Sequence, residues 1–130
     1  MPIAQPPVAY RVLGQLQLSS ASSWELLYTP TDPASIGSYT RCDAVCSTLT
    51  ICNLSPNTEE FYVAVVPGGG TPTNPNIVYN QVKIASNDTF AATFGITLYR
   101  DTGVADEIYV QASSTDVVFS LFGSEILTTP

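Results

Sequence analysis

The residues of this sequence best suited to chemistry are its carboxylates and its three cysteines, because the chain contains no histidine. Without histidine, a Ser-His or Cys-His nucleophile pair and a histidine general base cannot form. Adjacent carboxylates occur at Glu59-Glu60 and Asp106-Glu107, but neighbouring residues of a strand point to opposite faces of a sheet. Neither pair is therefore expected to converge on a substrate by itself, although two carboxylates from different strands could still meet, as in a glycosidase.

One tripeptide, Asp101-Thr102-Gly103, is typical of an enzyme. Aspartic proteases carry Asp-Thr-Gly or Asp-Ser-Gly, and two such carboxylates share a proton. The segment LYRDTGVADEIYV resembles the active-site segment of a retropepsin, and FGSEIL at 122–127 resembles that family's later glycine-containing helix start. A retropepsin needs a flap and several strands between these two elements, whereas here only about twenty residues separate them. Arg100 also stands where that family places an apolar residue. We therefore interpret the motif as a polar turn in which Gly103 supplies conformational freedom, with an aspartic protease dimer acting through Asp101 as the alternative.

The cysteines Cys42, Cys46 and Cys52 are odd in number and close together. A disulfide framework favours an even set in a secreted protein, and a zinc site needs a fourth ligand. We interpret them as buried or half-buried reduced thiols, with a three-thiolate metal site and a Cys42–Cys46 disulfide as alternatives. Several aspartates near turns could bind calcium, but such residues more often cap the turn itself; they are Asp88, Asp101, Asp106 and Asp116. The sequence therefore predicts no catalytic residue, no cofactor and no metal site.

The chain carries few charges, 12% of its residues, and its net charge is −7. Nucleic-acid binding requires clustered cations that displace counterions, and an anionic membrane surface attracts basic segments. The basic residues are instead scattered along the chain, so we expect neither partner; they are Arg11, Arg41, Lys83 and Arg100. A surface poor in long charged side chains is typical of tight contacts between proteins.

The N-terminal segment MPIAQPPVAY has neither the cationic start nor the apolar run of a signal peptide. No apolar run approaches the ~20 residues that span a bilayer. These two features predict a soluble protein that is made in a cytosol.

Alternating apolar and polar residues dominate the sequence and predict strands rather than helices. Gly-, Pro- and Ser-rich segments separate the alternating runs, and the prolines fall in arms and loops, as strand pairing requires. Short strands at regular spacing are typical of a sandwich or jelly roll. We expect about eight strands, at 8–18, 24–29, 44–53, 60–66, 76–84, 88–95, 106–112 and 116–123.

The sequence thus predicts an all-β, antiparallel, jelly-roll-like sandwich with an extended N-terminal arm. The arm covers residues 1–9 and is rich in proline, a single domain covers 10–127, and a short tail covers 128–130. In the first strand, the even positions from Val8 to Leu18 are expected to share one face. In the third, Val45 is expected to share a face with Leu49 and Ile51, opposite Cys46 and Cys52.

Several stretches, taken in order, resemble a family of small virion structural proteins from tailed phages, especially phages of cyanobacteria and other aquatic bacteria. They are YRVLGQ at 10–15, WELLYTP at 24–30, STLTICNLSPNTEEFYVAVVPGG at 47–69, NDTFAATFGITL at 87–98 and DEIYVQASSTDVVFSLFGSEI at 106–126. The family generally has LYT-x-P-x-G between the second and third strands, where this chain inserts extra residues in the loop at 30–43.

The resemblance implies a non-enzymatic capsid decoration (cement) protein that binds the major capsid protein lattice and stabilises the head. It also implies a homo-oligomer, with a trimer favoured, that is synthesised in the bacterial host cytoplasm and is located on the capsid surface of the virion. A tail, neck or baseplate component of the same virion is one alternative. The other is a carbohydrate-binding host-adhesion module that would use exposed aromatic residues, for which Trp24 and Tyr39 are the candidates, although Trp24 is expected mainly to pack in the core.

The predicted partner interface lies in the proline-rich arm and in two long loops, because long loops in a compact domain tend to be functional. Extended proline-rich segments are already restricted before binding, so ordering them costs less. The residues expected at the interface are Pro2, Ile3, Pro6, Pro7, Tyr10, Pro33, Ile36, Tyr39, Pro72, Asn74 and Pro75.

Overall fold

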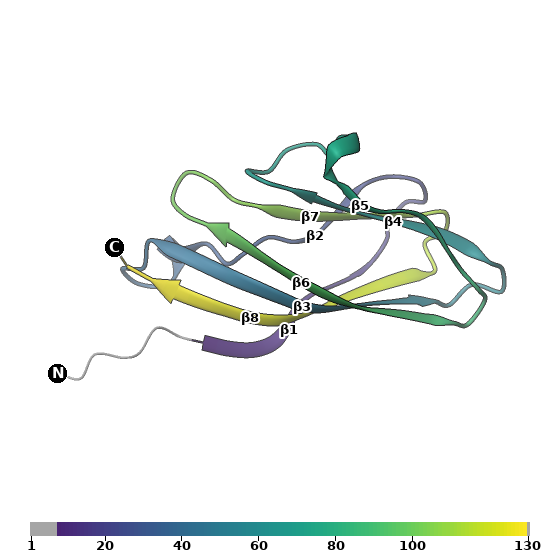
Figure 1. The fold of residues 1–130 in the computed structure, drawn as a ribbon, viewed down its shortest axis with the longest axis horizontal. Coiled ribbons are helices and arrows are strands. Elements are labelled where there is room, and N and C mark those ends of the chain that lie inside the picture. Colours follow the sequence, from purple (N-terminus) through teal and green to yellow (C-terminus); the bar gives the residue numbers. More distant parts are fainter. Residues whose placement is uncertain (1–7, 130) are drawn as a thin grey trace.

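The computed structural model describes residues 8–129, and in it eight strands form two four-stranded antiparallel sheets that pack face to face (Figure 1). The predicted all-β sandwich is confirmed. The strands are β1 (Val8–Gln17), β2 (Glu25–Tyr28), β3 (Arg41–Asn53), β4 (Glu59–Val66), β5 (Ile77–Ile84), β6 (Thr89–Arg100), β7 (Glu107–Ala112) and β8 (Val117–Thr128). Two short 3-10 turns, η1 (Pro33–Ser35) and η2 (Asn74–Asn76), lie in the loops before β3 and β5.

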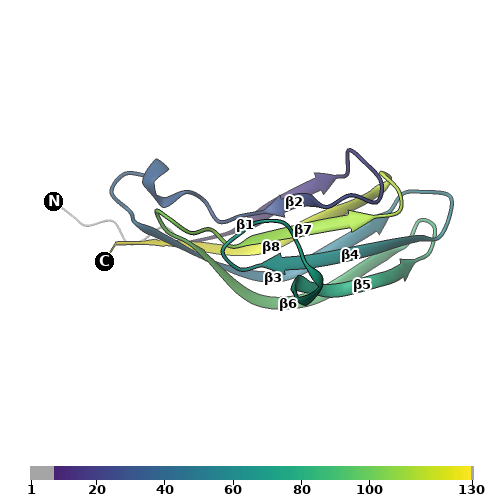
Figure 2. The same cartoon turned by 90° about the horizontal axis from the view of Figure 1, so that it is seen from above.

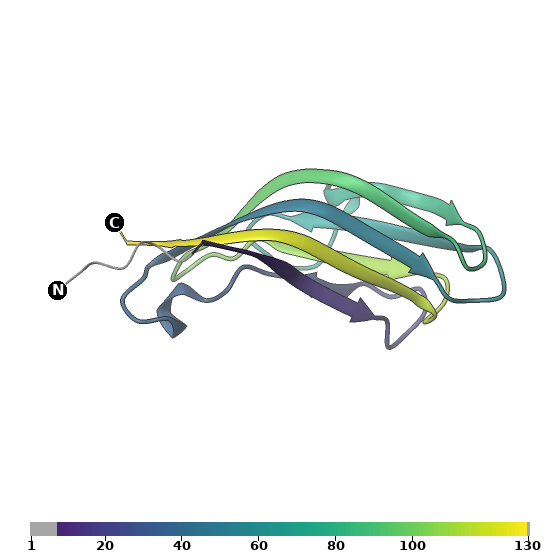
Figure 3. The same cartoon turned by 90° about the horizontal axis from the view of Figure 1, so that it is seen from below.

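The strand order is that of a jelly roll. One sheet runs β1-β8-β3-β6 and the other β2-β7-β4-β5. The first strand therefore pairs with the last, the second with the seventh, the third with the sixth and the fourth with the fifth, as if one long hairpin were folded over. Successive pairs fall in alternate sheets. Figures 2 and 3 show the two layers from opposite sides.

The core fills the space between the two sheets and is largely aromatic at one end. Phe61 of β4 is fully buried and lies 5.2 Å from Phe90 and 6.3 Å from Phe119, measured between ring centroids. Alternate residues of the central strands, such as Leu49 of β3 and Val110 of β7, complete the core with no exposed surface. Apolar residues at every second position thus form the strands and bury one face of each sheet.

A line of β-bulges crosses the first sheet and changes which residues point inward. In β3, Ser47 has no partner in the register with β8 or β6, so the alternation shifts by one residue there. Cys46 is consequently buried, whereas Val45 is 40% exposed on the outer face. The prediction that Val45 shares a face with Leu49 and Ile51 is therefore wrong.

A second bulge lies in β1, where the register with β8 skips Leu13. Beyond it, Leu16 and Leu18 face the core as predicted, but before it Tyr10 and Val12 point outward and are 84% and 45% exposed. The prediction that the even positions of this strand all share one face is therefore wrong for Tyr10 and Val12. A single inserted residue reverses the face of every side chain on one side of it.

Two strands run further than predicted because glycines sit inside them. Gly95 adopts φ +64° opposite the Ser47 bulge, and β6 continues to Arg100. A Cβ at Gly123 would lie 1.9 Å from the carbonyl oxygen of Val45, and β8 continues to Thr128, inside the predicted tail. Glycine is needed there because the neighbouring backbone comes too close for any side chain.

The last two residues of the predicted N-terminal arm belong to the folded domain. Val8 and Ala9 belong to β1, where they pair with Ile126 and Glu125 of β8. Residues 1–7 and 130 lie outside the described residues, and with them lie four of the predicted interface residues, Pro2, Ile3, Pro6 and Pro7.

Candidate functional site

The sheet β1-β8-β3-β6 forms one broad layer (Figure 3), and its outer face is almost free of charge. We call it the neutral face. The register of the four strands places on it Tyr10, Val12, Gln15 and Gln17 of β1; Val118, Ser120, Phe122, Ser124, Ile126 and Thr128 of β8; Arg41, Asp43, Val45, Thr48, Thr50 and Cys52 of β3; and Thr89, Ala91, Thr93, Thr97 and Tyr99 of β6.

The only charged residues of that set, Arg41 and Asp43, neutralise one another. The Nε atom of Arg41 donates to Oδ1 of Asp43 at 2.9 Å, and the guanidinium lies 4.4 Å from the centre of the Tyr99 ring. Stacking and ion pairing together hold Arg41 against the sheet. The neutral face therefore has no net charge, although the whole chain carries −7.

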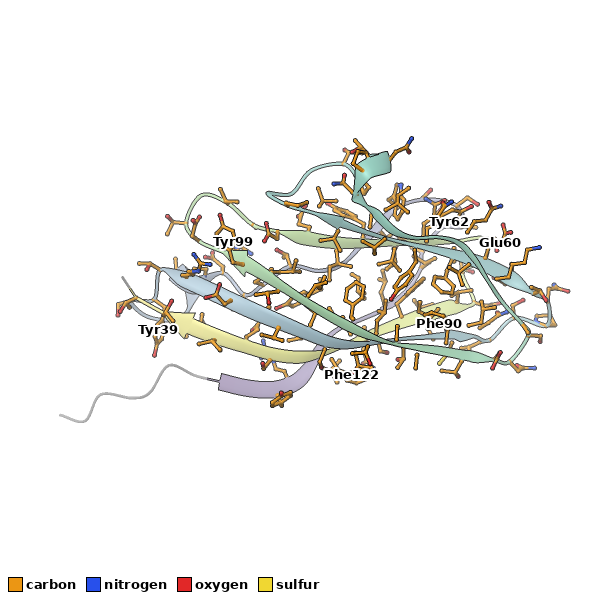
Figure 4. The ribbon with its side chains drawn as sticks, in the orientation of Figure 1. Tyr39, Glu60, Tyr62, Phe90, Tyr99 and Phe122 are labelled. Carbon is orange, nitrogen blue, oxygen red and sulfur yellow. The ribbon has the colours of Figure 1, made fainter. Side chains whose placement is uncertain are left out.

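Apolar side chains cluster on the half of the neutral face nearest the N-terminus of β1. Tyr10, Val12 and Val45 are exposed, and Phe122 and Ile126 are half-buried. Figure 4 shows Phe122 on the outer side of the sheet, away from the sandwich interior. Four strands at ~4.8 Å spacing, each presenting ~10 residues at ~3.3 Å, give the face an area of about 600 Å². A surface of this size and composition is suited to contact with another protein.

A buried carboxylate, Glu125 of β8, connects the neutral face to the loop that follows β2. Glu125 points between the sheets and accepts hydrogen bonds from the Tyr28 hydroxyl, from the backbone N–H of Thr31 at 3.1 Å and from the Thr31 hydroxyl at 2.8 Å. The half-exposed Arg11 of β1 forms an ion pair with it. Three strands and the first residues of the loop therefore meet at one side chain.

Electrostatics at this network keep Glu125 ionised. Burial disfavours the charged carboxylate, but the hydrogen bonds from Tyr28 and Thr31 and the charge of Arg11 outweigh it, so the pKa of Glu125 is lowered. Burial and the hydrogen bond to Glu125 raise the pKa of the Tyr28 hydroxyl, which stays protonated and donates. No buried polar side-chain atom of the described residues lacks a hydrogen-bond partner, so the buried part of the network is fully paired.

The three cysteines are free thiols and do not converge. Cys42 and Cys46 are buried beneath the neutral face, where burial and the charge of Glu125 raise their pKa values to about 11 and about 12. Cys52 belongs to the outer face, with its sulfur 3.5 Å from the hydroxyl oxygen of Thr89. The interpretation as buried or half-buried thiols is confirmed, and within residues 8–129 no group of thiols and carboxylates gathers as metal ligands would.

The motif Asp101-Thr102-Gly103 forms the turn between β6 and β7. Oδ1 of Asp101 accepts from the backbone N–H groups of Gly103 and Val104, both at 2.8 Å, and these bonds lower the pKa of Asp101. The carboxylate thus caps its own turn, as the sequence predicts, but Gly103 does not adopt a positive φ, so the conformational freedom expected of it is not used. An open depression of about 450 Å³ beside it is lined by Thr40, Arg41, Asp101, Thr102, Thr128 and Thr129.

The adjacent carboxylates Asp106 and Glu107 fix the glycine-rich loop after β4. Asp106 accepts from the N–H groups of Gly68 at 2.8 Å and Tyr99 at 3.0 Å. Glu107 accepts from the N–H of Gly70 at 3.0 Å. Both side chains are therefore engaged by backbone donors, and they approach different parts of the loop rather than one common point.

The structure does not bring together those predicted interface residues that lie within 8–129. Tyr10 lies on the neutral face, whereas the loop with Ile36 and Tyr39 lies at the end of the sandwich near the C-terminus (Figures 1 and 4). The loop with η2 stands on the outer side of the other sheet (Figure 1); there Asn74 and Pro75 are exposed and Pro72 is half-buried.

One predicted interface residue, Pro33, is fully buried. It is the first residue of η1, and Oδ1 of the preceding Asp32 caps η1 by accepting from the backbone N–H of Ala34. Its ring is therefore not available to a partner in this structure and instead supports the loop that exposes Ile36.

Sequence reasoning missed most of the neutral face. It places Val12 on one face with Leu16 and Leu18, and Val45 on one face with Leu49 and Ile51. It does not single out Phe122 or Ile126. These residues are apolar, as buried residues also are, so only the register of the strands shows whether such a residue faces the core or the solvent. The serine Ser47 among apolar neighbours is the one sequence signal that an interruption lies there.

Trp24 is half-buried rather than in the core. It packs edge-on against Tyr62, with ring centroids 6.3 Å apart, and Tyr62 projects from the outer side of β4. Figure 4 places Tyr62 and Tyr39 toward opposite ends of the sandwich. Trp24 and Tyr39 consequently do not form one aromatic platform.

Comparison with protein-family models and with curated proteins found no match for this chain. In the described part of the chain, no helix combines the length and hydrophobicity that crossing a bilayer demands.

Proposed function

We propose that this chain is a non-enzymatic structural protein of a phage virion, a capsid decoration protein that binds the major capsid protein lattice through the neutral face. The observation that supports the proposal most strongly is the absence of net charge on that face of a chain with net charge −7. The order of sequence segments that resembles virion proteins of tailed phages supports it further, and jelly rolls are frequent among virion proteins.

Physical requirements of capsid binding agree with this proposal. A decoration protein must resist deformation, and the Glu125 network, which links β1, β2, β8 and the loop after β2, would oppose it. The neutral face, about 600 Å², is smaller than the ~800 Å² per partner of a standard stable interface. Binding by one copy would therefore be weak, and many copies on a symmetric lattice would provide the avidity. The sequence resemblance adds a homo-oligomer to this proposal, with a trimer favoured for the protein bound to the capsid.

Quantitative mass spectrometry of virions, purified from the phage that would encode this chain, tests whether the protein lies on the capsid or in the tail. A capsid decoration protein is present in numbers comparable to the major capsid protein, on the order of hundreds per particle, because it follows the capsid symmetry. Tens of copies or fewer would indicate the alternative, a tail, neck or baseplate component. Absence of the chain from virions would refute both, and an electron microscopy map would locate it directly.

A second candidate function, carbohydrate binding, rests on the aromatic side chains of the other sheet. Trp24 and Tyr62 are half-buried neighbours there, and the register of β2 and β7 places Leu26 beside Tyr109 on the same outer side. Half-exposed aromatic rings can stack on sugars. A glycan array with wild-type protein and with Trp24→Ala tests it, because binding that survives the substitution, or no binding at all, removes this candidate.

A further inference from the structure

The first half of β6, a long edge strand with a bulge at Gly95, lacks the usual protection against pairing. Among the strands described, each sheet ends in two edges, β1 and β6 in one and β2 and β5 in the other. Natural edge strands are kept from pairing by shortness, charges, prolines or bulges. β2 has only four residues, β5 carries Lys83 and two register shifts, and β1 carries Arg11. β6 has twelve residues, with no charge and no proline from Thr89 to Tyr99.

The half of β6 before Gly95 is the most suitable for pairing. Gly95, at φ +64°, bends the strand at the bulge, which leaves the six-residue segment Thr89–Phe94, TFAATF, as an uninterrupted edge. Such segments, with high β-propensity and no charge, pair readily with another strand. Alternate residues of an edge strand point their backbone N–H and C=O groups away from the neighbouring strand, where a new partner can pair with them; in this segment the N–H of Thr89 already donates to Oδ1 of Asp88 at 2.9 Å.

Aromatic side chains lie at the same edge, on the inner side. Phe90 and Phe94 of β6 are half-buried and flank Tyr79 of β5, at ring-centroid distances of 5.8 Å and 6.0 Å. Figure 4 shows Phe90 in the space between β6 and the second sheet. This aromatic seam joins the two sheets at an edge that no described strand covers, so a strand added to β6 would bury apolar surface as well as satisfy backbone groups.

We propose that β6 pairs with β6 of a second copy of this chain, antiparallel and across a two-fold axis near Ala92. Residues that face one another across a strand pair must lie on the same side of the sheet. With Ala92 opposite Ala92, Phe90 lies opposite the partner's Phe94 on the inner side. Ala91 lies opposite the partner's Thr93 on the outer side. The segment is thus self-complementary, with small side chains at the axis and aromatic pairs on both sides of it.

The self-complementarity of the segment favours a second copy as the partner, and charge decides where two copies can meet. Two copies with net charge −7 each repel one another, and contact is easiest where neither carries charge. The segment Thr89–Phe94 and the neutral face beside it meet that condition. Pairing would join the two sheets into one of eight strands and place two neutral faces side by side, about 1,200 Å² in all. The inference does not depend on the proposed function, because it concerns the free protein.

Light scattering coupled to size-exclusion chromatography tests the inference on the full chain. The chain mass is 13.9 kDa, so a dimer has twice 13.9, or 27.8 kDa. We expect this mass to predominate over about 10 to 200 µM, corresponding to a micromolar dissociation constant. A monomer throughout this range would refute the inference. A trimer would also refute it, because a two-fold contact through one edge produces pairs, and would support the trimer that the sequence resemblance implies.

The double substitution Ala91→Lys/Thr93→Lys tests the register. Both side chains are exposed on the outer face, so the fold tolerates lysine at these positions. In the proposed pair, however, each introduced lysine ammonium lies opposite an introduced lysine ammonium of the partner chain. Like charges opposite one another destabilise strand pairs, and we expect the dissociation constant to rise at least 10-fold. The matched control is Gln15→Lys/Gln17→Lys, the same change at two exposed positions of β1, which should remain dimeric. Equal effects of both double variants would show that general repulsion, and not pairing through β6, decides association.

Hydrogen exchange provides a measurement that does not require a variant. Amides of Thr89–Phe94 should become better protected as protein concentration rises, whereas those of β2, another edge strand, should not change. Protection of β6 that is independent of concentration would contradict the pairing.

Discussion

The substitution Glu125→Gln tests the physical role of the buried network beneath the neutral face. Glutamine has the shape of glutamate but replaces one acceptor oxygen with an amide donor. One carboxylate oxygen accepts from Arg11 and the Thr31 hydroxyl, and the other accepts from the Tyr28 hydroxyl and the Thr31 backbone N–H. In either orientation of the amide, its N–H₂ therefore faces a donor, either the half-exposed Arg11 guanidinium or the fixed backbone N–H of Thr31.

The expected cost follows from these contacts. Losing a hydrogen bond to a charged group costs about 1.5–3 kcal/mol, and a donor left facing a donor adds about 1–3 kcal/mol. Arg11 is half-exposed and can turn to water, which removes part of the second cost. We expect a loss of about 3 kcal/mol in the free energy of unfolding, or a fall of roughly 10 °C in Tm for a chain of this size.

The pH dependence gives the same prediction a second readout. Because the pKa of Glu125 in the folded state lies below its ordinary value of 4.5, the folded protein binds fewer protons there than the unfolded chain. The stability that ionised Glu125 contributes is therefore full above pH 4.5 and is lost as pH falls through the lowered pKa. The difference between wild type and Glu125→Gln should be largest near pH 7 and should shrink in acid.

Urea unfolding at pH 7 and at about pH 3 measures both quantities. Asp43→Asn is the control, because it removes an exposed ion pair with Arg41 and should cost less than about 1 kcal/mol. A loss below about 0.5 kcal/mol for Glu125→Gln would refute this reasoning. A difference from wild type that stays constant with pH would refute the assigned ionisation.

Two further predictions concern packing and thiol reactivity. Gly123→Ala should cost about 3 kcal/mol or more, because its Cβ would lie 1.9 Å from the Val45 carbonyl oxygen, whereas Gly103→Ala should stay within about 0.5 kcal/mol; equal effects in thermal unfolding would contradict the close approach. A disulfide reagent should modify only Cys52 in the folded protein, because Cys42 and Cys46 are buried with pKa values of about 11 and about 12. Rapid modification of all three thiols would show that the sheet opens there.

The architecture was predictable from sequence because alternation and turn residues act locally. Eight alternating runs separated by breakers correspond to eight strands, and none of the strands needed information from elsewhere in the chain. The ends of β6 and β8 were not predictable, because Gly95 and Gly123 resemble breakers in sequence. Only the neighbouring strand shows that Gly123 is required by the close approach of Val45.

The candidate site was less predictable than the fold, because it depends on two inserted residues. Leu13 and Ser47 shift the alternation in β1 and β3, and thereby turn Val12 and Val45 from core residues into surface residues. The bulge at Leu13 has no sequence pattern distinct from a regular strand, and the bulge at Ser47 is signalled only by one serine among apolar neighbours. Tyr10 was recognised as an interface candidate for its position near the arm, and its high exposure is compatible with that prediction.

The most direct test of the central claim, that the neutral face binds the capsid, is capsid occupancy of two matched variants. Val12 on the neutral face and Val78 on β5 are similarly exposed, 45% and 49%, so Val12→Glu and Val78→Glu add the same charge to different surfaces. Added to capsids that lack the protein, Val12→Glu should bind at least 10-fold more weakly than wild type, because it places a charge in an apolar contact. Val78→Glu should bind as wild type does. Equal binding by the two variants would contradict the account.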